Sequence, residues 1–375
     1  MIFQNAIRFL LLLRRIWLRL MSRAILVFLC AIYGSSAALA AAGDGIAEKA
    51  AAGDAQAQVE LGEMYQRGQG VKQDFAQAAQ WYRKAANQDN LRAVTDLGYL
   101  YEAGLGVERD YARAFSLYQV AAKANWAQAQ NNLAELYDKA LGTARDYQKA
   151  MSWYRKAADQ GLAQAQTNVG FLYEMGRGVK RDYVTAMQWY SKAAAQEYGQ
   201  AENNIGSLYD RGLGVKQDRA VALEWYRKAV AHGNAQAECN LGYKYATGMG
   251  VKRDDVEAVR LYRLSAGQGF ALGQSNLGIM LETGRGVQRN YTEAAHWYEL
   301  AAKQGLPQGM MLLAMVYEAG HGVAQDNAMA LAWYRRAAEA GFRPAAQRLF
   351  RVYQFGQLGE QADPGRAKLW ADRAQ

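Results

Sequence analysis

One position recurs along this chain at an interval of 36 residues. Counted from Gly68, the same place is occupied eight more times, by glycine or, once, by alanine. The nine positions are Gly68, Gly104, Ala140, Gly176, Gly212, Gly248, Gly284, Gly320 and Gly356. Self-similarity at a fixed period of this size is typical of solenoids, in which each unit packs on its neighbours. We therefore predict nine units over residues 52–375, starting at residues 52, 88, 124, 160, 196, 232, 268, 304 and 340.

Each unit is predicted to contain two helices. An aliphatic residue such as Leu61 follows a small residue by four positions and precedes Tyr65 by four, which places all three on one helical face. The second helix begins after an N-cap such as Asp74 and carries a Trp-Tyr or Leu-Tyr pair. A glycine such as Gly62 inside the first helix costs about 1 kcal/mol relative to alanine, which predicts a close approach between helices. We expect an all-α fold, a right-handed α-solenoid of helix-turn-helix repeats.

The loop between the two helices, GQGVKQD at residues 68–74, has the two glycines and the lysine of a phosphate-binding loop. A phosphate site needs one such loop, whereas this chain repeats it in unit after unit. Its glycines are therefore interpreted as a turn, in which Gly68 caps the first helix in the left-handed conformation and Gly70 relieves the turn. The third unit has Ala140 and Thr143 instead of glycine and valine, which predicts a looser turn there.

Residues 1–40 have the pattern of a secretory signal. Arginines precede the apolar run at residues 24–33, and small residues follow it up to Ala38-Leu39-Ala40. We expect cleavage after Ala40, Met21 as an alternative start, a short lead-in at residues 41–51, and a periplasmic or secreted bacterial protein. An uncleaved membrane anchor is the alternative, although the apolar run is shorter than the ~20 residues that a spanning helix needs.

Composition argues against several kinds of site. The net charge of +9 falls to +4 without the five arginines of residues 1–40, so nucleic-acid binding is not expected. Beyond that segment Cys239 is the single cysteine, and the three histidines lie far apart, so neither a disulfide nor a metal site is predicted. No serine precedes a lysine by three positions, and G-x-S-x-G is absent. We predict no catalytic residue, no metal and no cofactor.

The repeated pattern A-x-A-x-x-x-L-G-x-x-Y-x-x-G-x-G-V, followed by D-x-x-x-A-x-x-W-Y-x-x-A-A, resembles the Sel1-like repeat (SLR) family, a relative of the tetratricopeptide repeat. The resemblance covers residues 52–375. It implies a scaffold that engages partner proteins, in exported members within the bacterial envelope. Some cysteine-rich members are linked to β-lactam binding and hydrolysis, but their paired cysteines are missing here. A protein- or peptide-binding scaffold is therefore predicted, with a membrane-tethered adaptor and a β-lactamase-like enzyme as alternatives.

A partner is expected along the first helices, which line the concave face of such arrays. Just before the aliphatic position, five consecutive units have asparagine. We name this set the asparagine ladder: Asn132, Asn168, Asn204, Asn240 and Asn276. An amide both donates and accepts hydrogen bonds, and so can hold the backbone of an extended peptide. The resemblance implies the same, because peptide-binding tetratricopeptide arrays grip their ligands with asparagine here. Hydrogen bonding between neighbouring repeats is the alternative role.

Two further columns of the first helix bear on specificity. The position three after the ladder varies, and Tyr99, Phe171 and Tyr243 are candidate anchors, since aromatic residues are enriched in binding hot spots. Ordinary packing is the alternative for these three. An acidic column has two candidate roles, attraction of a basic partner or neutralisation of basic residues on the second helices. It consists of Glu102, Asp138, Glu174, Asp210, Glu282 and Glu318.

Overall fold

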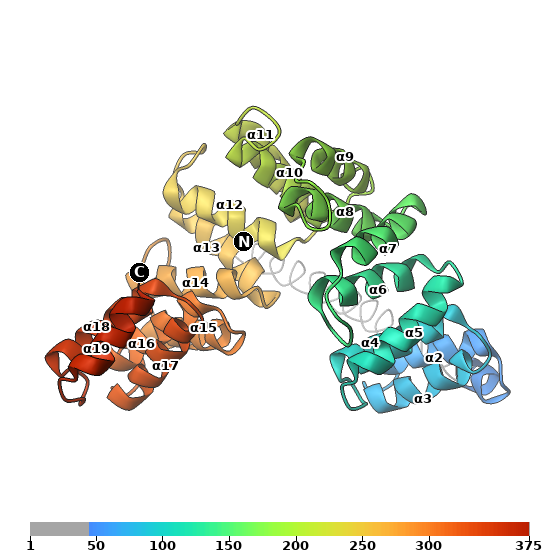
Figure 1. The fold of residues 1–375 in the computed structure, drawn as a ribbon, viewed down its shortest axis with the longest axis horizontal. Coiled ribbons are helices and arrows are strands. Elements are labelled where there is room, and N and C mark those ends of the chain that lie inside the picture. Colours follow the sequence, from blue (N-terminus) through green and yellow to red (C-terminus); the bar gives the residue numbers. More distant parts are fainter. Residues whose placement is uncertain (1–44, 375) are drawn as a thin grey trace, which may run out of the picture. The chain divides into compact units, whose positions relative to one another are not determined.

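In the computed structural model, which describes residues 45–374, the chain is a succession of paired helices (Figure 1). Within this range no residue lies in a β-strand, so the predicted all-α fold of paired helices is confirmed. Residues 45–51 of the predicted lead-in are helical. The predicted signal sequence at residues 1–40, with its cleavage site and its alternative start, lies outside the described residues.

Each repeat has a first helix and a second helix. The first helices are α2 (Ala55–Arg67), α4 (Leu91–Ala103), α6 (Ala127–Lys139), α8 (Ala163–Met175), α10 (Gly199–Arg211), α12 (Ala235–Thr247), α14 (Ala271–Thr283), α16 (Pro307–Ala319) and α18 (Arg343–Phe355). The second helices are α3 (Phe75–Ala86), α5 (Tyr111–Lys123), α7 (Tyr147–Asp159), α9 (Tyr183–Ala194), α11 (Arg219–Ala231), α13 (Asp255–Gly267), α15 (Tyr291–Lys303), α17 (Asn327–Glu339) and α19 (Pro364–Arg373). Every first helix therefore starts 36 residues after the previous one.

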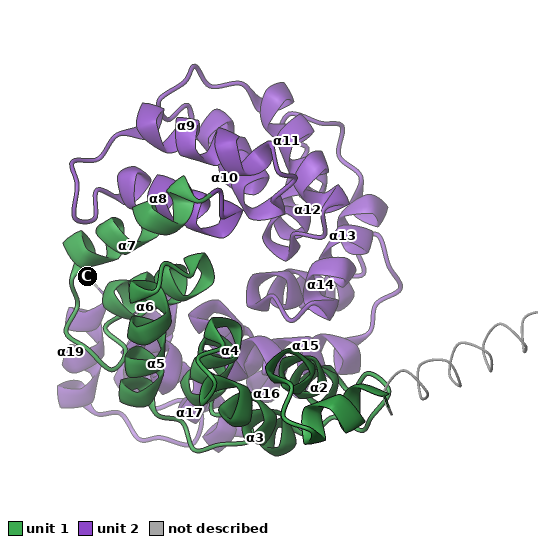
Figure 2. Cartoon of the chain, turned by 90° about the vertical axis from the view of Figure 1, so that its right-hand side faces the viewer, with its two compact units in different colours: residues 1–160 green, residues 161–375 purple. Residues whose placement is uncertain are grey.

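The helices belong to two compact units, unit 1 up to Gln160 and unit 2 from Gly161 onward (Figure 2). Within each unit, every helix packs against the next one in the chain. In unit 2 the first helices α10, α12, α14 and α16 also contact one another, whereas no contact of that extent joins consecutive second helices among the described residues. From α10 to α16 the first helices thus form the more closely packed layer, on which three members of the predicted asparagine ladder lie.

The predicted helix ends are confirmed. Each second helix begins at an Asp or Asn whose side chain accepts backbone N–H groups; Asp74, for example, accepts from Ala76 and Gln77 at 2.9 and 3.0 Å. Each first helix ends at a left-handed residue, such as Gly68 with φ 67°. The looser turn predicted for the third repeat is wrong, because Ala140 takes the same conformation with φ 60°. That turn keeps its geometry although a Cβ atom is present at a positive φ.

The second glycine of several interior loops makes a contact that the sequence analysis missed. Gly106 and Gly286 have φ values of 66° and 67°. A Cβ atom on Gly106 would lie 2.2 Å from the carbonyl carbon of Phe75, and one on Gly286 would lie 2.1 Å from the carbonyl oxygen of Asp255. Both clashes are with the first residue of the previous repeat's second helix. The second glycine is therefore needed for contact between repeats as well as for the turn.

The glycine inside the first helix lies against an aromatic ring, as the predicted close approach requires. A Cβ atom on Gly62 would lie 2.5 Å from the ring of Tyr82, and one on Gly278 would lie 2.4 Å from the ring of Tyr298. Tyr82 and Tyr298 are fully buried, each in the second helix of the same repeat. The same pairing occurs at Gly98, Gly170, Gly206 and Gly242. Each such glycine makes room for the largest core side chain of its hairpin.

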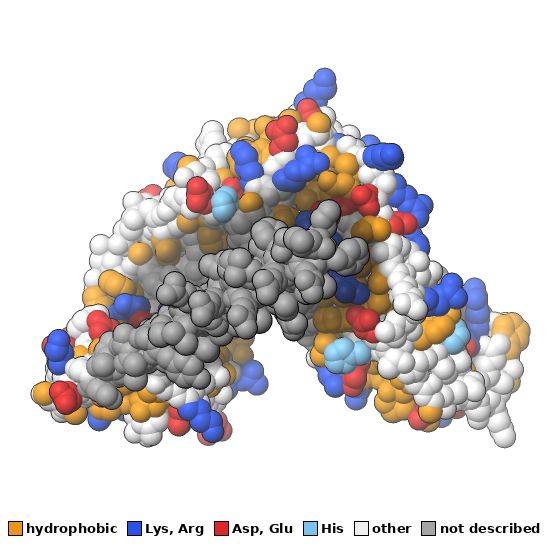
Figure 3. Space-filling view, turned by 180° about the vertical axis from the view of Figure 1, so that it is seen from behind, with side chains coloured by type: hydrophobic (Ala, Val, Ile, Leu, Met, Phe, Trp, Pro, Cys, Tyr) orange, Lys and Arg blue, Asp and Glu red, His pale blue; other side chains and the backbone are white. Residues whose placement is uncertain are grey.

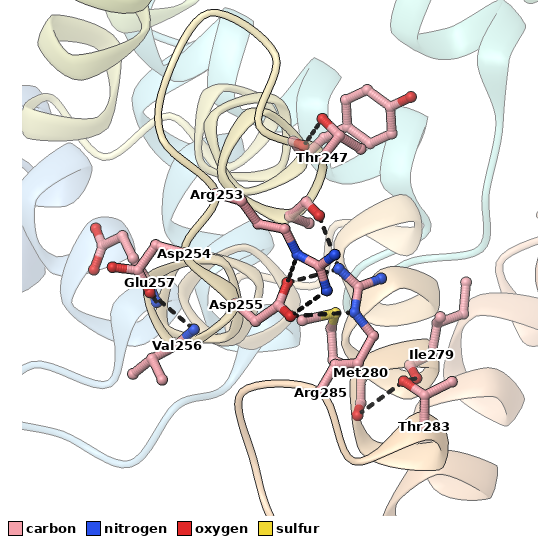
Figure 4. A network of polar contacts seen from close by, with 12 residues as sticks. Thr247, Arg253, Asp254, Asp255, Val256, Glu257, Ile279, Met280, Thr283 and Arg285 are labelled. Atoms are coloured by element: carbon pink, nitrogen blue, oxygen red, sulfur yellow. Dashed lines mark hydrogen bonds and ion pairs between the residues drawn. The ribbon is translucent and has the colours of Figure 1, made fainter.

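Asp255 at the start of α13 forms an ionic contact with the next repeat of unit 2 (Figure 4). Arg285, in the loop between α14 and α15, donates from Nη2 to Oδ1 of Asp255 at 2.6 Å and to the carbonyl of Ala246 at 2.8 Å. Arg253 donates to the other carboxylate oxygen of Asp255 at 2.6 Å. The hydrogen bonds from Arg253 and Arg285 lower the pKa of Asp255 to about 2. Most other repeats have an aromatic residue at this position.

A buried polar pair joins the two helices within several repeats. Its first member lies in the first helix, and its second member follows the second helix 30 residues later. Four of these pairs join two glutamines at 2.8 to 2.9 Å: Gln58–Gln88, Gln130–Gln160, Gln166–Gln196 and Gln274–Gln304. In the fifth repeat the pair is ionisable, since His232 Nδ1 lies 2.7 Å from Oε2 of the buried Glu202.

Replacing Gly286 with alanine is expected to destabilise unit 2 by at least ~3 kcal/mol, since it combines a left-handed φ with overpacking against backbone. Gly269→Ala is the matched control, because φ is 83° there but nothing lies within 4 Å of an added Cβ atom. The control is expected to lose only ~1–2 kcal/mol. The measurement is denaturant unfolding followed by circular dichroism. Equal losses in the two variants would contradict the proposed contact between repeats.

The Glu202–His232 pair is expected to make stability depend on pH. The hydrogen bond to Glu202 raises the pKa of His232, and the charge of Glu197, 3.8 Å away, raises it further. The stabilisation is therefore complete below about pH 6.5, the ordinary pKa of histidine, and is lost as the pH rises through the raised pKa of the folded state. His232→Gln, which copies the Glu238–Gln268 pair of the next repeat, should flatten this dependence in thermal melts. Between about pH 6 and 8 the melting temperature of the wild type should fall more than that of the variant. An equal change in the two proteins would contradict the proposed role of the pair.

Candidate partner-binding surface

The asparagine ladder lies half-buried on the first helices. Asn168, Asn204, Asn240 and Asn276 are on α8, α10, α12 and α14 of unit 2, and Asn132 is on α6 of unit 1. The four members in unit 2 thus lie on consecutive first helices, of which α10, α12 and α14 contact one another. Each has one side against the core and the other toward solvent, as a surface for a partner requires.

The ladder amides already form hydrogen bonds within the protein. Asn240 donates from Nδ2 to Oδ1 of the buried Asn203, one repeat earlier, at 2.9 Å. Asn276 lies 3.4 Å from the sulfur of Cys239, also one repeat earlier. Asn204 accepts from Gln200 at 3.0 Å within its own helix. Asn240 and Asn276 thus form hydrogen bonds between repeats, which was the alternative role. The binding of a partner by the ladder stays a prediction.

A second row of amides, which the sequence analysis missed, runs beside the ladder. Gln200 donates to Gln236 of the next repeat at 3.1 Å and accepts from Asn234 at 3.1 Å. In unit 1, Gln128 donates to Asn132 at 2.9 Å. Glutamine four residues before the ladder was the available signal, because that spacing places both side chains on one helical face. The two rows together form an uncharged surface rich in donors and acceptors.

The variable column carries exposed apolar side chains. Tyr99 in unit 1 is 44% exposed, and Tyr243 in unit 2 is 45% exposed. Met315, which was not singled out from the sequence, is 46% exposed on α16. Phe171 is half-buried, with the guanidinium of Arg177 5.3 Å from its ring. Of the three predicted anchors, Tyr99 and Tyr243 are therefore free to contact a partner and Phe171 is partly covered.

The acidic column has a role that neither prediction anticipated. Glu102, Glu174, Glu282 and Glu318 each accept a hydrogen bond from a buried tyrosine hydroxyl of the second helix in the same repeat, at 2.7 to 2.8 Å. Burial raises the pKa of Glu102, and the hydrogen bond from the tyrosine opposes that shift. Neutralisation of second-helix cations was the wrong expectation for Glu174, Asp210 and Glu318. Their ion pairs are with residues of the next first helix, Arg211, Lys244 and Arg348.

Three further observations concern metal binding, the thiol of Cys239 and membrane spanning. Among residues 45–374 no group of three His, Cys, Asp or Glu side chains is placed to hold a metal ion. Cys239 is buried, and burial raises the pKa of its thiol to about 12, so it stays protonated at neutral pH. Over the same range no helix is both long and apolar enough to span a bilayer.

Comparison with known families decides the assignment. The family model described as Sel1 repeat matches nine consecutive segments: residues 55–90, 91–126, 127–162, 163–198, 199–234, 235–270, 271–306, 307–342 and 343–374. The chain is a Sel1-repeat protein. The segments start three residues after the predicted repeat starts and coincide with the starts of the first helices. A search of curated proteins found no match for this Sel1-repeat protein.

Several solved structures are similar to this chain. The protective antigen c5321 of uropathogenic Escherichia coli, which displays an SLR fold, is 33% identical, with 88% of this chain and 79% of that one covered and a TM-score of 0.51. A Sel1 repeat protein from Oxalobacter formigenes is 30% identical, with coverages of 75% and 96% and a TM-score of 0.49. The immunity protein PA5088 from Pseudomonas aeruginosa is 22% identical, with coverages of 56% and 80% and a TM-score of 0.42.

The two ladder amides with contacts between repeats should differ in their effect on stability. Asn240→Ala leaves the buried Asn203 oxygen without its donor, which is expected to cost ~1–3 kcal/mol. Asn276→Ala removes only a bond to sulfur, a weak acceptor, and is expected to cost less than ~1 kcal/mol. Denaturant unfolding of the two variants measures the difference. Equal costs would show that the Asn240–Asn203 bond adds nothing beyond the common loss of an amide.

Proposed function

We propose that this Sel1-repeat protein is a non-catalytic scaffold of the bacterial cell envelope that binds an extended segment of a partner protein along the first helices of unit 2. The observation that carries the proposal is the exposure of Tyr243 beside the asparagine ladder. Tyr243 follows Asn240 by three residues, so the two are neighbours on the surface of α12. A large half-exposed aromatic side chain is thus set next to an amide that can hold peptide backbone.

The repeat geometry fits an extended peptide. Packed helices lie about 8–10 Å apart, and an extended chain rises about 3.3 Å per residue. About three peptide residues would therefore pass each first helix, so the four ladder members in unit 2 would accompany roughly ten residues. Amides recur at every repeat and suit the peptide backbone, which is the same at every residue. The variable column differs from repeat to repeat, as a surface that distinguishes side chains must.

The ladder and the variable column are expected to contribute differently to the binding free energy. A net hydrogen bond contributes about 0.5–1.5 kcal/mol, so four ladder contacts supply little affinity after the peptide is ordered. Fully covered aromatic residues contribute about 2 kcal/mol or more in hot spots. Tyr243 and Met315 in unit 2 are the exposed candidates for that role. The ladder would align the partner, and the exposed apolar side chains would select it.

The proposed location depends on residues 1–40. The basic segment, the short apolar run and Ala38-Leu39-Ala40 support export and cleavage. The same apolar run supports a tethered adaptor if cleavage does not occur. The intact mass of the protein recovered from the cell envelope distinguishes the two, since a first residue of 41 supports export with cleavage, and a retained residue 1 or 21 supports the tether.

Partner binding is expected to depend on Tyr243 and not on second-helix surfaces. The partner is first identified by envelope crosslinking from a photoreactive residue at position 279, in the variable column of α14. Its binding to the purified protein is then measured by calorimetry. Tyr243→Ala should weaken binding at least about tenfold, the loss expected for a hot-spot aromatic residue.

Val256→Ala is the matched control, because Val256 is 67% exposed on the second helix α13 of the same repeat. It should leave the affinity unchanged, and both variants should keep the wild-type circular dichroism spectrum. Equal affinities for the wild type and Tyr243→Ala would reject the proposed surface. So would a loss of affinity in Val256→Ala as large as that in Tyr243→Ala.

A further inference from the structure

Unit 1 contains a pocket of about 310 Å³ between α3, α4 and α5. Its apolar lining includes Val94 and Leu97 from α4, both buried, and the half-buried Leu117 from α5. Val120, 60% exposed, lines it as well. None of the predicted partner-binding residues lines this pocket. Its volume lies at the lower end of the range of about 300–1,000 Å³ for small-molecule sites.

The second repeat departs from most others at two positions that line the pocket. Leu117 stands where seven repeats have tryptophan: Trp81, Trp153, Trp189, Trp225, Trp297, Trp333 and Trp370. Val94 stands where six repeats have a glutamine or glutamate, which in the buried pairs reaches the end of the second helix. The second repeat has lost both an indole ring and a polar pair from the region between its helices. Apolar side chains line the pocket at both positions.

Two guanidinium groups accompany this apolar lining. Arg83 donates to the hydroxyl of Tyr101 at 3.1 Å, and Arg113 lies 4.8 Å from the centre of the same ring. Within residues 45–374 neither arginine forms an ion pair with a carboxylate. Asp89 is the one acid that lines the pocket, so the lining carries a net charge of +1. A ligand with a single negative charge matches this charge, whereas a di- or triphosphate does not.

We propose that this pocket is a binding site for a small monocarboxylate with an apolar body, of the arylalkanoic acid class. The apolar body packs against Val94, Leu97 and Leu117, and the carboxylate receives charge-assisted hydrogen bonds from Arg83 and Arg113. Binding displaces no existing ion pair of either arginine. The site is separate from the proposed partner surface, so either can fail experimentally without the other.

The test is calorimetric titration of the full chain, after any cleavage of its N-terminal segment, with 3-phenylpropionate. A single saturable site is expected, with a dissociation constant on the order of 0.1–1 mM for a ligand of this size. The uncharged analogue 3-phenylpropan-1-ol should bind at least about tenfold more weakly, because it lacks the charge that the arginines recognise. Absence of saturable binding by the acid, or equal binding of acid and alcohol, would overturn the proposal.

Two variants locate the site. Leu117→Trp fills the pocket with the residue that most other repeats carry, and should abolish binding while keeping the fold. Arg83→Met should weaken binding at least about tenfold. Its matched control is Arg227→Met, because Arg227 donates at 3.4 Å to Tyr245, 18 residues later as Tyr101 is from Arg83, but lines no part of this pocket. Unchanged binding in Leu117→Trp, or equal losses in Arg83→Met and Arg227→Met, would overturn the assignment to this pocket.

Discussion

The contact between a tyrosine ring of the second helix and a glycine of the first determines how most hairpins of this protein are built. With the ring of Tyr190 against Gly170, its hydroxyl reaches Glu174 one turn further along α8, at 2.7 Å. Glu174 also lies 3.5 Å from Arg211 on the next first helix. Apolar packing inside one repeat therefore places the polar group that contacts the following repeat. Residues of the acidic column form contacts within and between repeats, which explains why charge alone misidentified their role.

The regular features of the fold were predictable because each follows from a local rule repeated nine times. The helix pairs, the Asp and Asn caps and the left-handed ends of the first helices all follow from short patterns around Gly68 and Asp74. What lay beyond prediction was contact between residues far apart in the chain. The need for Gly286 arises from the backbone at Asp255, 31 residues earlier, and no pattern within one loop contains that information.

The candidate site was predictable in position but not in detail. The columns identified the helical face and two exposed anchors, Tyr99 and Tyr243. The sequence could not reveal that Asn240 is engaged with Asn203, because a single column does not show its neighbour in the adjacent helix. The most specific chemistry lies where repeats depart from the pattern. One such departure is Leu117, which lines a pocket. Another is Asp255, which forms an ion pair where most repeats have an aromatic residue (Figure 4).

The space-filling view shows that basic and acidic side chains are interspersed over the visible face (Figure 3), in keeping with the small net charge of residues 41–375. No large patch of one charge sign covers the visible face. A charged polymer would therefore be attracted at some points of that face and repelled at others. Recognition at the proposed partner surface would therefore depend on local arrangements such as Tyr243 beside Asn240, more than on long-range electrostatic attraction.

The last hairpin inverts the size rule of the others. Phe350 occupies the glycine position and Ala371 the tyrosine position, and Phe350 packs on the core that includes Trp370. The glycine and the tyrosine of the other repeats contact each other within one hairpin, so the exchange is complete inside this hairpin. Joining its first helix to the second helix of another repeat would set Phe350 against a tyrosine. Recombination that separates the two helices of this hairpin is therefore expected to be tolerated less well than recombination between whole hairpins.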